Sequence, residues 1–219
     1  MKHKYELLDK NYWNNKFKQD KLLNITSDWI LNFENLNPTI LKFFNKNDKI
    51  LFVGCGNSDF SSKLYDMGYI EQTNIDISEI VIYEMQSKNK YRTSQQWDIG
   101  DVLNMPYLDN IYDVVFDKSL FDCMLYLDPT IKHSTIQNML KECTRVLKRS
   151  GIFIFITTYS YNKIKHLLNL KCNISVEHYI IKCDNNKNIY KSAKLQIYDS
   201  SLNYTNNFED IYIYICSKL

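Results

Sequence analysis

The feature that most constrains this chain is an alternation of short apolar runs with longer amphipathic segments. The runs are rich in β-branched and aromatic residues, and the segments repeat apolar residues every three or four positions. The runs lie at 49–53, 70–77, 94–102, 112–119 and 152–158, and the helical segments at 59–69, 79–88 and 133–148. Strands that are apolar on both faces need helices against each face. The alternation therefore predicts an α/β fold with a doubly wound, mostly parallel sheet.

The first 45 residues precede the first strand and are largely helical in character. They carry three large aromatic residues, Trp13, Phe17 and Trp29. Such residues either pack against the sheet as ordinary core or close over a bound ligand. We expect residues 1–45 to form a helical lid.

The end of the chain breaks the alternation. Residues 174–181 and 210–216 have strand character, and no strong helix lies between them. Two late strands without a crossover predict an antiparallel pair at one end of the sheet. We expect one domain over 1–219, in which residues 46–158 bind the ligand and residues 159–219 add the C-terminal strands on the side of the second substrate.

Composition argues against several classes of function. A net charge of +2 gives no basic footprint for a phosphate backbone, so we expect no nucleic-acid partner. The six cysteines include no CxxC pair, which argues against a structural zinc site. The apolar runs are too short to span a bilayer, and the N-terminus lacks the apolar segment of a secretory signal. We expect a cytoplasmic monomer with reduced thiols, no metal and no membrane contact.

The first strand ends in the sequence ILFVGCGNS, in which Gly54 and Gly56 follow the apolar run directly. Glycine has no Cβ and tolerates left-handed backbone, so backbone N–H groups at such a turn can approach a ligand closely. In a doubly wound sheet, ligands bind at the carboxyl ends of the strands. The same pattern also fits a turn that merely ends a buried strand.

Acidic residues follow the next three strands. Asp76, in NIDIS, comes about 20 residues after the glycine turn, where a carboxylate can accept hydrogen bonds from both hydroxyls of a ribose. It could also only cap the next helix. Asp101 and Val102 follow the third strand and suit the exocyclic amine and the face of an adenine. Asp117 and Lys118 follow the fourth strand, and suitable groups at four successive strand ends favour a nucleoside ligand.

The glycine turn narrows the choice of nucleoside. It reads G-C-G-N-S-D, without the third glycine of the dinucleotide fingerprint and without the Lys-Ser/Thr of a P-loop. A pyrophosphate is therefore not favoured. An adenosine without phosphates, carrying an amino acid that lies near the glycines, fits the set better. This description matches S-adenosylmethionine.

Five stretches carry a family resemblance: YWNNKF, DWILNF, ILFVGCGNSDFSSKLYDMGY, NIDISEIVI and DVVFDKSLFDCML. They resemble the seven-strand, Rossmann-like methyltransferases that depend on S-adenosylmethionine. Within these, they are similar to the branch with the lysine methyltransferases of elongation factor one-alpha and of mitochondrial citrate synthase. The resemblance covers about residues 5 to 158. It implies a seven-stranded sheet, S-adenosylmethionine as cofactor, S-adenosylhomocysteine as product, and a protein substrate that could be a translation elongation factor.

The resemblance also implies which residues hold the cofactor. The aromatic residues Trp13, Phe17 and Trp29 would close over it, and Gly54 and Gly56 would line its methionine part. Asp76 would hold its ribose, and Ile77, Asp101 and Val102 would meet its adenine. Lys118 would meet its carboxylate.

Two positions depart from the family's pattern. Members usually have glycine after the lysine of the fourth strand, and this chain has Ser119. An acidic residue often stands two positions before the first glycine, and this chain has Phe52 there, as this branch is apolar at that position. The first departure would reshape the entrance for the acceptor. The second leaves the methionine amine to be held by backbone and other side chains.

The chemistry implied is in-line displacement of a methyl group from sulfur by a neutral lysine amine. Removal of the proton from such an amine, with a pKa of about 10.4, needs desolvation or a nearby base. Asp117 and Tyr159, at the ends of the fourth and fifth strands, are the candidate catalytic residues. Asp122 is a further candidate, although a place on a helix surface suits it better. Cys55 and Cys123 are expected in the core.

Three other functions compete with this one. A small-molecule methyltransferase would share every cofactor residue, because the acceptor-binding loops vary most. A non-catalytic methyltransferase-fold subunit would not need the complete set of cofactor-binding residues. A nicotinamide-dependent oxidoreductase is disfavoured by the missing third glycine and the antiparallel C-terminal strands. No NPPY-like sequence follows the fourth strand, which argues against the amide and exocyclic-amine methylation that uses it.

Overall fold

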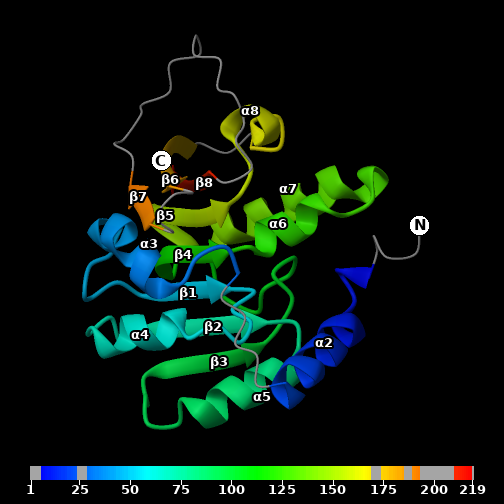
Figure 1. Ribbon diagram of the computed structural model, residues 1–219, viewed down its shortest axis with the longest axis vertical. Coiled ribbons are helices and arrows are strands. Elements are labelled where there is room, and N and C mark those ends of the chain that lie inside the picture. Colours follow the sequence, from blue (N-terminus) through cyan, green and yellow to red (C-terminus); the bar gives the residue numbers. More distant parts are fainter. Residues whose placement is uncertain (1–5, 24–28, 169–173, 185–188, 193–209, 219) are drawn as a thin grey trace.

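A computed structural model describes residues 6–23, 29–168, 174–184, 189–192 and 210–218. The strands are β1 (Ile50–Val53), β2 (Gln72–Asp76), β3 (Gln95–Ile99), β4 (Tyr112–Lys118), β5 (Leu147–Thr157), β6 (Ile174–Asp184), β7 (Ile189–Ser192) and β8 (Ile211–Lys218). They form one sheet in the order β3-β2-β1-β4-β5-β8-β6-β7 (Figure 1). Because β1 lies in the middle and the order runs outward from it in both directions, the sheet is doubly wound, as the alternation predicts.

The first five strands are parallel, and β8 pairs antiparallel with both β5 and β6. The mostly parallel sheet with antiparallel C-terminal strands is therefore confirmed. One difference is β7, a four-residue strand that pairs with β6 at the edge and brings the total to eight. The segment around β7 is rich in asparagine and lysine and lacks an apolar run, so its sequence does not predict a strand.

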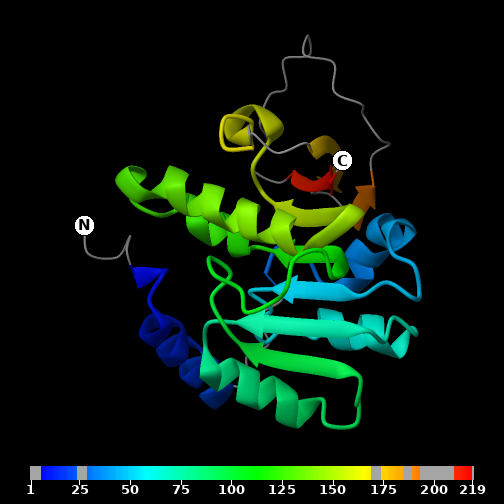
Figure 2. The same ribbon diagram turned by 180° about the vertical axis from the view of Figure 1, so that it is seen from behind.

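The helices are α2 (Lys10–Leu22), α3 (Phe33–Ile40), α4 (Phe60–Asp66), α5 (Glu79–Lys88), α6 (Leu120–Leu125), α7 (Pro129–Val146) and α8 (Tyr161–Ile164), with a 3₁₀ turn at Leu41–Phe43. Figure 1 shows α3 and α4 in front of the sheet, and Figure 2 shows α5 and α7 in front of its other face. The sheet thus has helices on both faces. Helix α2 lies beside α5, on the side toward which the parallel strands point.

Strand β1 shows how the layers form. All four of its residues are buried. Leu51 and Val53 belong to the apolar cluster that includes residues of α6 and α7, whereas Ile50 and Phe52 belong to the cluster that includes residues of α3 and α4. Alternate side chains of a strand point to opposite faces, so a continuous apolar run is what a strand covered on both faces requires.

Helix boundaries follow from local capping. Helix α5 begins after Ser78, whose hydroxyl accepts a hydrogen bond from the Val81 N–H, as expected of an N-cap. The helix expected at 133–148 instead spans Pro129–Val146. It begins one turn earlier because the Asp128 carboxylate accepts a hydrogen bond from the Thr130 N–H, and proline suits the first helical position. In the part of the chain that the structure describes, no helix is long and apolar enough to cross a membrane.

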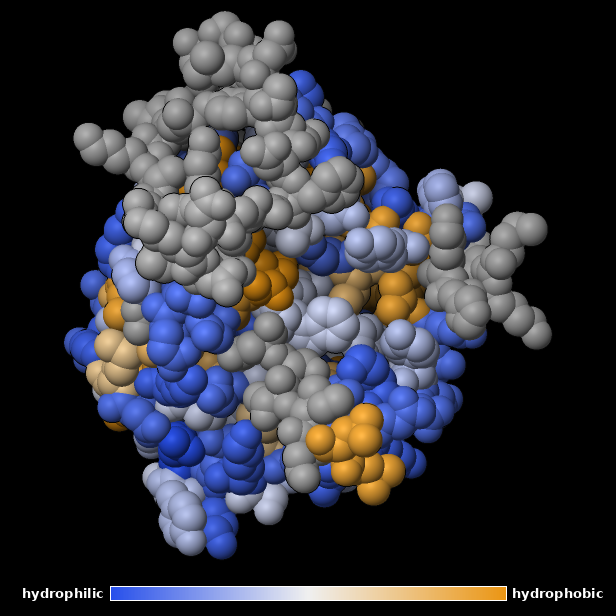
Figure 3. Space-filling view, viewed as in Figure 1, coloured by the Kyte–Doolittle hydropathy of each residue, from blue (hydrophilic) through white to orange (hydrophobic). Residues whose placement is uncertain are grey.

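The end of α2 carries exposed apolar side chains. Leu22 and Leu23 are 83% and 68% exposed, and Figure 3 shows an apolar patch over this end of the helix. Trp29, the next aromatic residue along the chain, is 45% exposed. Surface leucines of this kind are common singly, but a group of them marks a surface suited to contact with another apolar surface.

Candidate active site

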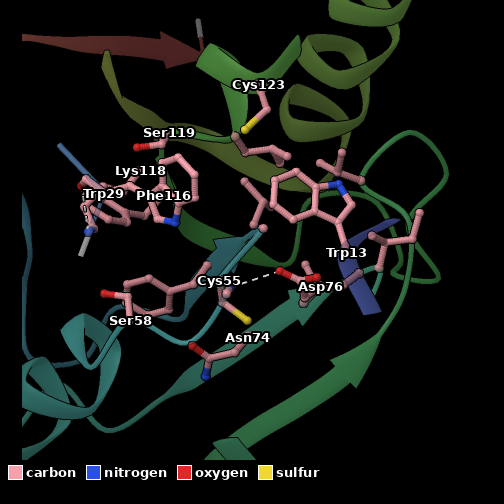
Figure 4. Close-up of a pocket in the computed structure, with 18 of the residues that line it drawn as sticks. Trp13, Trp29, Cys55, Ser58, Asn74, Asp76, Phe116, Lys118, Ser119 and Cys123 are labelled. Atoms are coloured by element: carbon pink, nitrogen blue, oxygen red, sulfur yellow. Dashed lines mark hydrogen bonds between the residues drawn. The ribbon is translucent and has the colours of Figure 1, made fainter. Parts of the chain in front are cut away.

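A cavity opens at the carboxyl ends of β1, β2 and β4, where the doubly wound topology predicts a ligand site. It encloses about 1090 Å³, part of which is open solvent at its mouth. Its lining includes every residue predicted to bind the cofactor: Trp13, Phe17, Trp29, Gly54, Gly56, Asp76, Ile77, Asp101, Val102 and Lys118. Figure 4 labels Trp13, Trp29, Asp76 and Lys118 among them.

The glycine turn forms the floor of the cavity. Gly54 and Gly56 have φ values of +57° and +53°, which side chains with a Cβ rarely adopt. A Cβ on Gly54 would also lie 2.9 Å from Leu120 Cδ2, so glycine lets β1 and the start of α6 meet closely. Both conditions explain why glycines follow this strand.

Asp76 joins the glycine turn to the start of α5. Its carboxylate accepts hydrogen bonds from the Gly56 and Ser78 N–H groups, each at 2.9 Å. Burial raises the pKa of Asp76 to about 6, and these backbone hydrogen bonds partly oppose the rise. A carboxylate has about four acceptor positions, so capping and ribose binding do not exclude each other. Asp76 therefore serves the local backbone and still faces the cavity.

The residues predicted for the adenine lie together on the β2 and β3 side of the cavity. Ile77 follows β2, and Asp101 and Val102 follow β3. The Asp101 carboxylate accepts a hydrogen bond from the Leu103 N–H at 2.9 Å, which fixes the loop, and Val102 is buried. The arrangement places two apolar side chains beside a carboxylate, which suits a purine with an exocyclic amine.

The three N-terminal aromatic residues all reach the cavity, but to different extents. Phe17 is buried and packs with Val81, Met85 and other residues of α5, so it is both core and cavity wall. Trp13 is half-buried, and its indole N–H donates to the Leu7 carbonyl at 2.9 Å. Trp29 is the most exposed of the three. Core packing therefore applies mainly to Phe17, whereas the more exposed Trp13 and Trp29 are better placed for ligand contact.

Lys118 has a partner that the sequence does not predict. Its ammonium group donates to the Trp29 carbonyl at 3.0 Å and the Leu31 carbonyl at 3.2 Å. Between them Ile30 has φ +69°, and the Leu31 N–H donates back to the Trp29 carbonyl at 2.9 Å. A branched residue in this tight left-handed turn is strained, so the lysine holds a strained segment that begins at the cavity wall with Trp29. A cofactor carboxylate in the expected place would have to share the Lys118 ammonium with the Trp29 and Leu31 carbonyls.

Asp117 is placed differently from the prediction of a catalytic base. It is fully buried and is not part of the cavity lining. Its carboxylate accepts hydrogen bonds from the Leu120 and Phe121 N–H groups, at 2.7 and 2.9 Å, and so caps α6. Burial raises its pKa to about 8. The geometry supports a role in positioning α6 and does not bring this carboxylate to an acceptor.

Tyr159 and Asp122 also lie outside the cavity lining. Burial raises the pKa of Tyr159 to about 12, with a smaller contribution from its hydrogen bond to the Tyr126 side chain. Asp122 does not lie on a helix surface, because it is 9% exposed. One carboxylate oxygen accepts hydrogen bonds from the Thr158 N–H and hydroxyl.

Several lining residues were missed by sequence reasoning. Cys55 and Cys123, expected in the core, are half-buried in the cavity wall, and burial raises the pKa of both thiols. Asn74 and Ser58 add polar atoms behind the glycine turn. The positions of three of these residues in the sequence could have predicted a place in the cavity wall, because Cys55 and Ser58 lie in the glycine turn and Cys123 lies in the helix after β4. The position of Asn74, inside β2, does not predict that it lines the cavity.

These features define a class of protein. Doubly wound topology, a glycine turn, a ribose-type carboxylate and an apolar wall beside Asp101 fit an adenosine that carries an amino acid. The sequence matches the family described as methyltransferase domain over residues 44–207. The chain belongs to this methyltransferase-domain family, whose cofactor is S-adenosylmethionine and whose product from it is S-adenosylhomocysteine.

Solved structures share the fold. A phosphoethanolamine N-methyltransferase from Haemonchus contortus, solved with phosphoethanolamine and S-adenosylhomocysteine, has a TM-score of 0.60 at 14% identity and covers 99% of this chain and 51% of that one. A possible histamine N-methyltransferase from Thermotoga maritima has a TM-score of 0.57 at 13% identity and covers 99% and 100%. At these identities the likeness concerns the fold alone.

Curated relatives are closer in sequence. The human eEF1A lysine and N-terminal methyltransferase is 33% identical over 148 residues, which is 67% of this chain and 21% of that protein. Mouse EEF1A lysine methyltransferase 4 is 28% identical over 174 residues, covering 76% of this chain and 68% of that protein. The chain thus spans about a fifth of the length of the first relative and about two thirds of the second.

Proposed function

We propose that this protein transfers a methyl group from S-adenosylmethionine to the side-chain amine of a lysine in another protein. The observation that carries the proposal is the cavity at the carboxyl edge, where the glycine turn, Asp76, Asp101 and Lys118 lie together. The names of the curated relatives support lysine as the acceptor.

Within this proposal the cofactor-binding residues have separate roles. Asp76 would hold the ribose, Ile77 and Val102 the adenine, and Gly54 the methionine part. When bound, the cofactor would supply a methyl group on a positively charged sulfur. The amine nitrogen would bond to the methyl carbon as the carbon–sulfur bond breaks and leaves its electrons on sulfur. The residues that line the cavity would keep the reacting groups in line, and such positioning can supply most of the acceleration.

The acceptor must arrive without its proton. Among the described lining residues the carboxylates are Asp76 and Asp101, which belong to the adenosine side of the cavity. The walls beside Lys118 are instead apolar and include Phe116, Leu120 and Trp29. Desolvation by such walls lowers the pKa of a lysine amine, and water at the mouth can take the proton. We propose this route in place of a dedicated carboxylate base.

A protein acceptor suits the surface around the mouth. Trp29 lines the cavity and is 45% exposed, and Leu22 and Leu23 expose apolar surface at the end of α2. Residues 159–219 would complete the acceptor side, and their part at 193–209 lies outside the described residues. A translation elongation factor is the substrate we propose, and it would place the enzyme in the cytoplasm.

Transfer of radiolabelled methyl groups tests this function. The purified protein is incubated with labelled S-adenosylmethionine and a cell lysate, with an Asp76→Ala variant as the control that lacks ribose binding. We expect one labelled protein band, lost with the control and lost when the target lysine becomes arginine. Label only in the small-molecule fraction would show a small-molecule acceptor. No transfer despite cofactor binding would show a non-catalytic subunit.

A further inference from the structure

The inner side of α2 is unusual because two of its three buried residues are polar. Helix α2 buries Asn14, Phe17 and Asp20, which are spaced three positions apart and lie on one side of the helix. Asp20 pairs with Lys16 of the same helix at 2.7 Å, and Phe17 packs in an apolar cluster with residues of α5. A helix that places so little apolar surface in the core needs further contacts to fix its position.

Asn14 supplies such contacts to the start of α5. Its side-chain carbonyl accepts a hydrogen bond from the Ser78 hydroxyl at 2.7 Å, and its amide donates to the Glu79 carboxylate at 3.3 Å. Asn14 is 8% exposed, and Ser78 is fully buried. The ion pair of Lys10 with Glu79 joins the same two helices, but its side chains are 42% and 40% exposed, and such pairs contribute little. Asn14 is therefore a buried polar link between α2 and α5.

This link leads to the carboxylate that is expected to hold the ribose. Ser78 donates from its hydroxyl to Asn14 and from its backbone N–H to the Asp76 carboxylate, the latter at 2.9 Å. Trp13 and Phe17 of α2 line the same cavity as Asp76, and Figure 4 shows Trp13 and Asp76 on the same side of it. The position of the α2 aromatic residues relative to Asp76 therefore depends on the contact between Asn14 and Ser78.

An apolar side chain would be buried at this position at less cost. A buried amide loses its hydration, and its hydrogen bonds only about compensate that loss. Leucine has a similar size and needs no partner. Hydrogen bonds require defined distances and angles, however, whereas apolar contacts tolerate a helix that slides or turns. The asparagine thus favours one placement of α2 more than it favours stability.

We propose that Asn14 is a positioning residue for the cofactor, which holds Trp13 and Phe17 in place over the cavity through its hydrogen bonds to Ser78 and Glu79. Asn14 is not among the described residues that line the cavity, so it acts through α2 and not by touching the ligand. The proposal rests on the proposed function, because it takes the ligand to be S-adenosylmethionine. It gives a role to the residue that follows Trp13 in the motif YWNNKF.

Ligand binding by two variants of α2 tests the proposal. Asn14→Leu removes both hydrogen bonds and keeps most of the side-chain volume, and Asn15→Ala is the matched control because Asn15 is exposed on the same helix. Calorimetry measures binding of S-adenosylhomocysteine and of 5′-methylthioadenosine, which lacks the amino-acid part. We expect Asn14→Leu to bind both ligands on the order of tenfold more weakly, since Trp13 and Asp76 share one side of the cavity. Asn15→Ala should bind both as the wild type does.

Two further measurements separate positioning from general stability. In urea without ligand, the unfolding midpoint of Asn14→Leu should equal or exceed that of the wild type, so that affinity falls without a loss of stability. Ser78→Ala removes the donor to Asn14 and keeps the N–H that binds Asp76. Asn14→Ala and Ser78→Ala should each weaken binding, and the double variant should weaken it by less than the product of the two factors.

The possible failures are distinguishable. Wild-type affinity of Asn14→Leu for S-adenosylhomocysteine, or equal weakening in Asn15→Ala, would overturn the role of Asn14 and leave the proposed function intact. Independent effects of Asn14→Ala and Ser78→Ala would do the same. A lower unfolding midpoint of Asn14→Leu, or loss of its cooperative transition, would also overturn it, because Asn14 would then serve the fold as a whole. If the wild type bound neither ligand, the proposed function itself would fail, and this proposal with it.

Discussion

Among single residues, Asp76 connects local folding to ligand binding most directly. Its carboxylate fixes the Gly56 and Ser78 backbone, and burial raises its pKa from an ordinary 3.8 to about 6. Because the folded pKa lies above the unfolded one, the folded state binds more protons between these values. The stability contributed by Asp76 is therefore greatest in acid and falls as pH rises from about 4 to 6.

Ligand binding should show the opposite trend. Only the ionised carboxylate accepts hydrogen bonds from both ribose hydroxyls, so affinity for methylthioadenosine should rise roughly tenfold between pH 5 and pH 7. Calorimetry at a series of pH values measures this. Asp76→Asn, which does not titrate, is the matched control and should give a flat profile. A sloping profile in the variant would assign the titration to another group.

The two glycines of the turn should differ in their tolerance of a side chain. Both have positive φ, so alanine at either position should cost about 1–2 kcal/mol. Gly54→Ala would also press its Cβ against Leu120, 2.9 Å away, whereas the nearest atom to a Cβ on Gly56 is Phe17 Cζ at 3.6 Å. Urea unfolding should therefore show a larger loss for Gly54→Ala.

A second substitution checks the cause. Leu120→Ala should recover part of the stability lost in Gly54→Ala and none of that lost in Gly56→Ala. Equal losses in both single variants would mean that strain alone decides, without the contact to α6.

At the scale of elements, the chain between α2 and α3 is tied to the end of β4. Lys118 holds the Trp29 and Leu31 carbonyls, and Ile30 between them is strained. Leu31 is also buried in the apolar cluster of α3 and α4, and the Lys16 ammonium lies 5.6 Å from the centre of the Trp29 ring, so Lys118 supplies one of several contacts that local opening of this segment would break. Opening of this kind belongs to the low-stability end of a native protein, where binding segments are usually found.

Lys118→Met keeps the side-chain length and removes the donors. We expect the amide of Leu31 to exchange with solvent about 30-fold faster, which corresponds to loss of about 2 kcal/mol of local stability. Hydrogen exchange resolved by residue measures it. Lys148→Met is the control, because Lys148 pairs with Asp113 near the opposite ends of the strands. Unchanged exchange at Leu31 would show that the segment is held by other contacts.

The strands of the parallel sheet could be predicted from the sequence, whereas two long-range side-chain contacts could not. Strands β1, β4 and β5 were predictable because each contains a continuous apolar run, whereas the mostly polar β2 and β3 were predictable only from their place in the alternation with helices. The Lys118 contact was not, since its partners lie 87 and 89 residues away in sequence and are backbone carbonyls, which carry no residue signature. The place of Asp122 was predicted wrongly for a related reason: a carboxylate in a short helix suggests exposure to solvent, and the hydrogen bonds from Thr158 that compensate its burial come from a residue 36 positions away.

At the scale of the whole molecule, β8 joins two parts of the sheet. It pairs with β5 on one side and β6 on the other, and Ile213 lies within it, fully buried and opposite Ile156 and Tyr179. The parallel sheet built by residues 50–157 thus becomes continuous with β6 and β7 only through this strand.

Proline in this strand should abolish folding. Ile213→Pro removes a backbone donor from a strand paired on both sides, a position where proline is essentially not found. We expect loss of the cooperative unfolding transition, measured by circular dichroism on heating. Ile213→Val keeps the donor and most of the volume, and should cost only about 0.5–1.5 kcal/mol. A folded Ile213→Pro protein would mean that the sheet tolerates a break at β8.

The central place of β8 has a consequence for refolding. Until residues 211–218 pair, β5 and β6 expose two facing rows of unpaired N–H and C=O groups that fit the same eight residues. Every other chain in solution carries those eight residues as well, so a neighbour's strand can fill the gap and produce an exchanged dimer. We expect the yield of monomer after dilution from denaturant to fall as protein concentration rises, with exchanged dimers visible by gel filtration.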